Sequence, residues 1–232
     1  MPYRRLPNTD NARIRSLRMA IEKLKTSDNP ELIRYDVQTL EIMLRNFENA
    51  QIMYRQSLSK QVTENQKFQK LVKNARLYIS HFIQVLNLAI IRNEIKKEIK
   101  SHYGLTEDSY SVPDLMSNEA ILTWGENILK GESIRVQQLG GTPIYNPTIA
   151  RVNVAFSQFK EAYFNQKTYQ NITIRQLDNL SQQRNSIDSI LCTLWNEIES
   201  AFSYLNTQER IKCCKEYGIV YYLRKSERQK NI

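Results

Sequence analysis

The fold is decided by a long stretch with neither glycine nor proline, residues 31–103, which includes the run LEIMLRNFENAQIMYRQSL at positions 40–58. Within it, Leu40, Phe47 and Tyr54 are spaced by seven residues. The same spacing continues through Gln61, Phe68, Ala75, Phe82 and Ala89. Heptad spacing predicts helical structure that packs along its length against neighbouring helices at a shallow angle.

The heptad pattern becomes polar at residues 61–67, where Gln61 and Asn65 occupy positions that are apolar elsewhere in the stretch. We therefore expect the chain to break near residues 63–66 and to form two antiparallel helices. The alternative is one continuous helix, because the heptad phase is unchanged across the polar segment.

Residues 105–146 differ in kind, because glycine and proline are concentrated there. Ser117 is suited to cap a short helix that reaches about Lys130, since its side-chain oxygen can accept a free backbone N–H. Residues 132–139 are expected to form a short extended piece, followed by a turn at residues 140–143. The region is interpreted as a connecting subdomain or flap.

A second stretch without glycine or proline, residues 148–217, again has apolar residues at heptad spacing. They are Phe156, Phe159, Tyr163, Leu177, Leu180, Ile187, Leu191, Leu194, Ile198, Ala201 and Leu205. Asn146-Pro147 is suited to begin its helix, and residues 208–217 are expected to form a last short helix.

The two long stretches align with an offset of 112 residues, which raises the hypothesis of an internal duplication. The alignment pairs Phe47 with Phe159, Ala50 with Ala162, Ile79 with Leu191, Phe82 with Leu194, Leu86 with Ile198 and Ala89 with Ala201. Such matches are weak support, because heptad helices align at any multiple of seven. The shared endings Tyr103-Gly104-Leu105 and Tyr217-Gly218-Ile219 are more independent support.

These patterns predict an all-α protein, a long antiparallel helical bundle with a four-helix-like core and a small irregular subdomain inserted. The expected parts are an N-terminal helical half at residues 1–104, the connecting subdomain at 105–146 and a C-terminal helical half at 147–232. We expect them to form one compact domain overall.

Positive charge is concentrated at the two ends of the chain, which carries a formal net charge of +9. Residues 1–25 contain seven basic and two acidic residues, and residues 207–232 contain seven basic and three acidic ones. If the fold brings the ends together, their charges form one basic surface that could attract phosphate, an acidic protein or an anionic headgroup. The alternative is that these residues only keep the protein soluble.

Nucleic-acid binding is the most specific function that this charge pattern favours, because tyrosines lie among the basic residues at both ends. The candidate contacts are Arg4, Arg5, Arg13, Arg15, Arg18, Arg224, Lys225 and Arg228. No helix-turn-helix, RRM, KH or zinc-finger pattern accompanies them.

Motifs for enzymatic chemistry are missing from the sequence. It contains no GxxxxGK(S/T) or GxGxxG phosphate-binding loop and no GxSxG nucleophile motif. We therefore expect no catalytic residue, no metal site and no cofactor. If the protein were an enzyme, its site would be expected between bundle and flap, with Trp124, Glu126, Arg135 and Tyr145 as candidate pocket residues.

No apolar run is long enough to predict a membrane span, which needs about 20 largely apolar residues. The first residues also lack the apolar segment of a signal peptide. The three cysteines, Cys192, Cys213 and Cys214, are odd in number, and the sequence has no CxxC pair. A cytoplasmic location is expected on these grounds.

Three segments resemble those of uncharacterised all-helical bacterial proteins of similar length. They are the opening PYRRLPNTD at residues 2–10, IYNPTI at residues 144–149 and VYYLRK at residues 220–225. The resemblance covers the whole chain and implies an all-helical fold. It carries no known activity, so it assigns no functional residue.

Long heptad faces can pack within the chain or against another protein, and an excess of apolar surface favours a homodimer. The expected function is therefore that of a non-enzymatic cytoplasmic scaffold or protein-interaction protein, with a protein partner or a second copy as its ligand. Nucleic-acid binding through the basic ends is the alternative.

Overall fold

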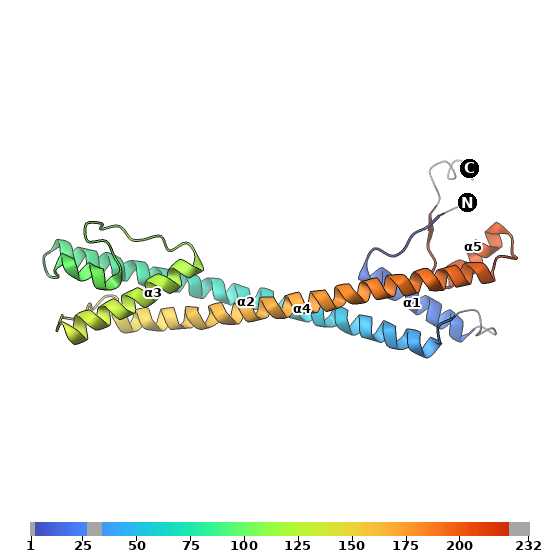
Figure 1. Cartoon of the computed structure of the whole chain (residues 1–232), viewed down its shortest axis with the longest axis horizontal. Helices are drawn as coiled ribbons and strands as arrows, with labels where there is room; N and C mark the ends of the chain where they lie inside the picture. The colour runs from blue at the N-terminus through green and yellow to red at the C-terminus, as the bar shows by residue number, and fades with distance from the viewer. Residues whose placement is uncertain (1–2, 27–33, 223–232) are drawn as a thin grey trace. The chain divides into compact units, whose positions relative to one another are not determined.

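The computed structural model describes residues 3–26 and 34–222 and is almost entirely helical. The helices are α1 (Asp10–Lys25), α2 (Val37–Ile91), α3 (Asn118–Ser133), α4 (Ile149–Ala201) and α5 (Thr207–Glu216). A 3-10 helix, η2 (Lys97–Tyr103), and a short π-helix, η3 (Ile134–Gln138), complete the helical elements of the described residues. The all-α fold class is confirmed, and the long helices α2 and α4 are its main members (Figure 1).

The expected break near residues 63–66 is wrong, because α2 runs without interruption from Val37 to Ile91. The polar residues 61–67 lie inside this continuous helix, where some of them contact α4. Asn65 Oδ1 accepts a hydrogen bond from Gln166 Nε2 of α4 at 3.4 Å, and the Lys60 ammonium lies 5.1 Å from the centre of the Tyr169 ring. Because these polar side chains have partners on the neighbouring helix, their position between the helices does not require the chain to turn.

The extended piece expected at residues 132–139 is also wrong, because α3 continues to Ser133 and passes into η3. Glycine is required at position 131 of this helix, because a Cβ there would come within 2.5 Å of the Tyr103 ring. The helical path also places Glu132 and Arg135 one turn apart, where they form a buried ion pair.

The chain forms two compact units, each of which draws on both halves of the sequence. Unit 1 comprises Met1–Leu58 and Ile172–Ile232, and unit 2 comprises Ser59–Asn171. Unit 1 therefore contains α1, the first part of α2, the last part of α4 and α5. Unit 2 contains η2, α3 and the remaining parts of α2 and α4.

The core of unit 1 is built around Trp195, Phe47 and Leu17, all of which are fully buried. Ala20, Ile21 and Leu24 of α1 pack on the same cluster. The start of α1 is set by Thr9, whose side-chain oxygen accepts the backbone N–H of Ala12. At the other end of the chain, Tyr217 and Ile219 after α5 join the same core.

The core of unit 2 is aromatic, with Phe68, Phe82, Phe156 and Phe159 buried. α2 and α4 run antiparallel there, since Phe68 of α2 stacks on Phe159 of α4 while Asn65 meets Gln166. α3 begins at Ser117, which accepts the backbone N–H of Ala120 in the same way as Thr9 caps α1.

The observed element order favours the internal duplication. Both α1 and α3 have 16 residues, α2 and α4 begin 112 positions apart, and η2 and α5 both lead into a Tyr-Gly pair. Gly104 and Gly218 in these pairs have φ values of 68° and 79°, the left-handed region. None of the helices that the structure describes is both long and apolar enough to cross a membrane.

Candidate functional site

The structure brings the two chain ends together in unit 1. The strand β1 (Tyr3–Arg4) pairs antiparallel with β2 (Tyr221–Tyr222), and the Tyr3 ring stacks on the Tyr222 ring at a centroid distance of 6.1 Å. This pairing is the arrangement that a shared basic surface at the ends requires.

Most of the described N-terminal cations proposed to contact anions are held by carboxylates of the same unit. Arg4 Nη1 lies 3.1 Å from Glu199 Oε2, and Arg18 Nη2 lies 2.5 Å from Glu48 Oε1. Arg13 donates two hydrogen bonds of 2.7 Å to Asp188. Their positive charge is therefore largely compensated within the fold.

Arg5 and Arg15 are exposed and form no ion pair with another described residue. Arg224, Lys225 and Arg228 lie outside the described residues. The described part of the chain thus contributes two exposed and uncompensated arginines to the predicted basic surface.

A second charged network ties α1 to α4. Arg184 donates two hydrogen bonds, of 2.7 and 2.8 Å, to the carboxylate of Asp10, and Arg13 lies 3.6 Å from the same carboxylate. The hydrogen bond from Arg184 holds the pKa of Asp10 below its usual range. These ion pairs are explained by helix packing and need no ligand.

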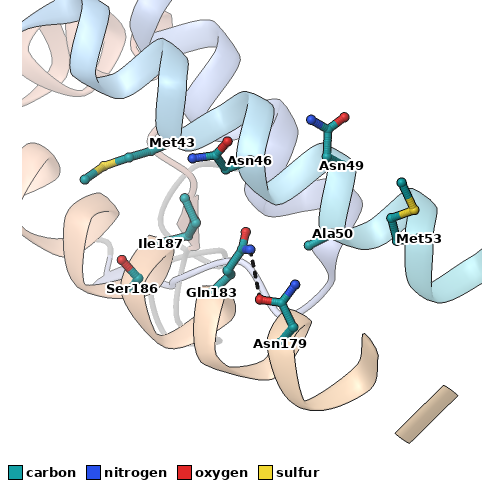
Figure 2. Close-up of a pocket in the computed structure, with 9 residues that line it drawn as sticks. All are labelled: Met43, Asn46, Asn49, Ala50, Met53, Asn179, Gln183, Ser186 and Ile187. Atoms are coloured by element: carbon teal, nitrogen blue, oxygen red, sulfur yellow. Dashed lines mark hydrogen bonds between the residues drawn. The ribbon is translucent and has the colours of Figure 1, made fainter. Parts of the chain in front are cut away.

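Unit 1 also has an open groove between α2 and α4, which we call the amide groove (Figure 2). It has a volume of about 450 Å³. Its floor consists of Ala50 and Ile187, both 3% exposed, together with Met43. Its walls are formed by Asn46, Asn49, Met53, Asn179, Gln183 and Ser186.

The amide groove is lined without a single charged side chain, and its polar groups are amides and one hydroxyl. Gln183 Nε2 donates to Asn179 Oδ1 at 3.3 Å, as Figure 2 shows. The face of α2 that contacts α1 is different, because Glu41 and Glu48 there pair with Lys25 and Arg18. The groove and α1 therefore occupy different sides of α2.

Unit 2 contains a larger hollow, the flap cavity, of about 810 Å³. It lies among the last part of α2, the residues around η2 and the segment from Leu139 to Asn146. The apolar residues that line it are Val85, Ala89, Ile95, Ile99, Leu139, Pro143 and Ile144, and the polar ones are Arg92, Glu94, Lys96, Arg135, Thr142, Tyr145 and Asn146.

Arg135, which lines the flap cavity, belongs to a buried polar cluster. Arg135 donates from Nε to Glu132 Oε2 at 2.9 Å and from Nη2 to Glu132 Oε1 at 2.7 Å. The hydroxyl of Tyr103 donates to Glu132 Oε2 at 2.5 Å and accepts from Arg135 Nε at 3.1 Å. Burial and the bond to Glu132 raise the pKa of Tyr103 far above its usual value.

We call residues 139–146 the flap, and this cluster holds them in place. The backbone N–H of Ile144 donates to Glu132 Oε1 at 3.4 Å, and the N–H of Gly141 donates to the Arg135 carbonyl at 2.9 Å. Because Glu132, Arg135 and Tyr103 satisfy one another, the arrangement positions the segment 139–146 and offers no activated nucleophile.

The four pocket residues expected from the sequence separate into two groups. Arg135 and Tyr145 both line the flap cavity, and Tyr145 is 77% exposed at its edge. Glu126 instead forms an exposed ion pair of 2.6 Å with Lys160, and Trp124 packs against the core of unit 2.

Sequence reasoning missed Glu132 and Tyr103, the two residues that anchor Arg135. The spacing of Glu132 and Arg135 by three residues could have indicated a pair on one helix face, but residues 132–139 were expected to be extended. In the sequence, Tyr103 belongs to the Tyr-Gly ending of a helix, and no local pattern indicates its contact with Arg135.

Comparison with known proteins finds no match: no family model, no curated protein and no solved structure is similar to this chain.

Proposed function

We propose that the protein is a non-enzymatic helical interaction protein that associates with a second copy of itself through the amide groove of unit 1. The observation that supports the proposal is the uncharged lining of this groove in a chain of which 25% of the residues are charged. Depletion of charge is what distinguishes the centre of a protein interface from other protein surface.

Exposed apolar side chains on the same two helices add to the surface available for contact. On α2, Ile42 and Met53 are 59% and 54% exposed, and on α4, Ile172 is 42% exposed. Ile42, Asn46, Asn49 and Met53 follow one another at intervals of four, three and four residues and so lie on one face of α2.

A second copy fits the chemistry of the groove better than a charged partner does. A symmetric dimer uses the same surface on both molecules, so that surface must be complementary to itself. Amide groups satisfy this condition because each can donate and accept hydrogen bonds. A surface that contained several charges of one sign would repel its copy.

The test is the mass of the protein in solution, measured by light scattering over a range of concentrations. We expect the mass to rise towards twice 27.4 kDa with concentration. A mass that stays at that of one chain from micromolar to near-millimolar concentration would overturn the proposal.

Substitution of Asn49 locates the interface. Both Asn49→Lys and Asn49→Glu should shift the equilibrium to the monomer, because each places an unpaired charge in the contact. The matched controls are Asn185→Lys and Asn185→Glu, since Asn185 is exposed on α4 and does not line the groove. Equal effects at positions 49 and 185 would contradict the assignment.

Nucleic-acid binding is the second candidate, and the pairing of β1 with β2 is the observation that favours it. The described arginines that could contact phosphate are Arg5 and Arg15. Binding of an oligonucleotide that weakens steeply with salt and is reduced in Arg5→Ala and Arg15→Ala would support it. Binding without salt dependence would exclude it.

A further inference from the structure

The flap cavity belongs to unit 2 alone and is independent of the amide groove. Its volume of about 810 Å³ lies in the range typical of small-molecule sites, and seven apolar residues supply much of its lining. The body of a ligand that occupies it would therefore be apolar.

The charges around the cavity define the polar part of such a ligand. Glu94 at the mouth is held by Arg92, with Oε1 at 2.8 Å from Nε and Oε2 at 3.1 Å from Nη2. Arg135, which also lines the cavity, is paired in the same bidentate way with the buried Glu132 behind it. The charges of Arg92 and Arg135 are thus compensated by Glu94 and Glu132.

One cation at the cavity mouth has no carboxylate partner among the described residues. Lys96 lines the cavity, is exposed and forms no ion pair with another described residue. In the wall, the bonds of Arg135 to Glu132 use Nε and Nη2, and Nη1 lies beside Gly141, where a Cβ would come within 2.8 Å of it. The site therefore favours a negative charge on its ligand.

We propose that the flap cavity binds a small apolar carboxylate, with the hydrocarbon part among Val85, Ala89 and Ile95 and the carboxylate at Lys96. The size of the hollow and its apolar lining select the hydrocarbon. The lysine at the mouth selects an anion over an amine or an alcohol with the same chain. This site goes beyond the interaction function proposed above.

The internal resemblance of the two long helices supplies a matched control. Ala89 lines the cavity on α2, and Ala201 stands 112 positions later on α4 in unit 1. Ala89→Leu adds bulk inside the cavity, whereas Ala201→Leu adds the same bulk in the other unit.

The experiment is calorimetric titration of the full chain with decanoate, decan-1-ol and decylamine. Decanoate should bind most tightly, and Ala89→Leu should abolish its binding while Ala201→Leu retains it. Lys96→Gln should weaken decanoate about threefold and leave decan-1-ol unchanged, as expected for one exposed ion pair. Lys97→Gln is the control, because Lys97 lies outside the cavity.

Nuclear magnetic resonance on the unsubstituted protein keeps the test valid if Ala89→Leu fails to fold. Decanoate should shift the amide signals of residues 139–146 and leave those of the amide groove unchanged. Binding of decylamine as tight as that of decanoate, shifts spread over both units, or no binding of decanoate would each overturn the proposal.

Discussion

Units 1 and 2 are built on matching helices, yet they differ where a ligand could bind. Each unit combines a helix of 16 residues, parts of α2 and α4, and a short helix that ends in Tyr-Gly. Buried apolar positions recur at the offset of 112, as Phe47 and Phe159 show with 0% exposure each. What the units share is therefore their packing.

The clearest difference lies fifteen residues after the N-cap of the 16-residue helix. In unit 1 this position is Leu24, which is 4% exposed and packs in the core. In unit 2 it is Glu132, which is 1% exposed and binds Arg135 and Tyr103. A buried carboxylate costs more free energy to desolvate than a leucine, so packing alone does not explain Glu132. In unit 2 this carboxylate accepts the backbone N–H of Ile144 and so holds the flap.

The comparison teaches where to look for function in a repeated architecture. Shared apolar positions are accounted for by stability, which both units need. The flap cavity of unit 2 and the paired strands of unit 1 are features that packing does not require.

The largest expected effects test the equivalence of the two cores. Phe47→Ala and Phe159→Ala should each lower the free energy of unfolding by about 3–5 kcal/mol, because both side chains are fully buried. Equilibrium urea unfolding followed by circular dichroism measures both. A loss several times larger in one unit than in the other would break the equivalence.

The second prediction concerns the buried carboxylate of unit 2. Glu132→Ala should lower the free energy of unfolding by about 3 kcal/mol, because it leaves the Arg135 guanidinium buried without its partner. The double variant Glu132→Leu with Arg135→Met should recover most of this loss, since it replaces the buried ion pair with apolar groups and places a leucine where unit 1 has Leu24. If the double variant is less stable than Glu132→Ala, the ion pair is not the cause.

The third prediction compares the two glycines after the short helices. Gly218→Ala should cost about 2–3 kcal/mol, because it combines a positive φ with a Cβ placed 2.6 Å from the Ser16 carbonyl oxygen. Gly104→Ala should cost about 1 kcal/mol, because its new Cβ meets only the end of the Asn127 side chain at 3.0 Å. Thermal unfolding of the two variants gives the difference, and equal costs would refute the steric argument.

The smallest effect tests the ion pairs that tie α1 to α4. Asp10→Asn should lower stability by about 1 kcal/mol at neutral pH, because the pKa of Asp10 in the folded state is below its usual value. This contribution is present above about pH 4 and is lost as the pH falls through the folded pKa, so the two proteins should converge in acid.

Urea unfolding at several pH values measures this convergence. The control is Asp108→Asn in unit 2, where the carboxylate is 91% exposed and its substitution should change stability little at any pH. A constant difference between Asp10→Asn and the unsubstituted protein down to strongly acid pH would contradict the sign derived from the pKa.

Much of the helical architecture could be predicted, because the absence of glycine and proline and the heptad spacing are local properties. The expected core residues Phe47, Phe82, Leu191 and Ile198 are all buried, and Ser117 caps α3 as predicted. The break near residues 63–66 could not be judged in this way. Whether polar residues end a helix depends on partners from another part of the chain, here Gln166 for Asn65.

The candidate sites were predicted less completely than the fold. Arg135 and Tyr145 lie at one cavity, but their neighbours Ala89, Arg92 and Lys96 come from a segment some 40 residues earlier in the chain. The amide groove had no sequence signal, because asparagine and glutamine on a helix surface are ordinary until two helices place them face to face.

The sequence by itself determined that this chain is helical, where α3 begins, and which residues of α2 and α4 are apolar enough to be buried. Only the tertiary structure decided that each unit takes segments from both halves, that Arg4, Arg13 and Arg18 are compensated by carboxylates, and that the flap covers a cavity. The physical reason is range: helix formation and capping depend on residues a few positions apart, whereas ion pairs, grooves and cavities depend on atoms from distant segments that meet only in the folded chain.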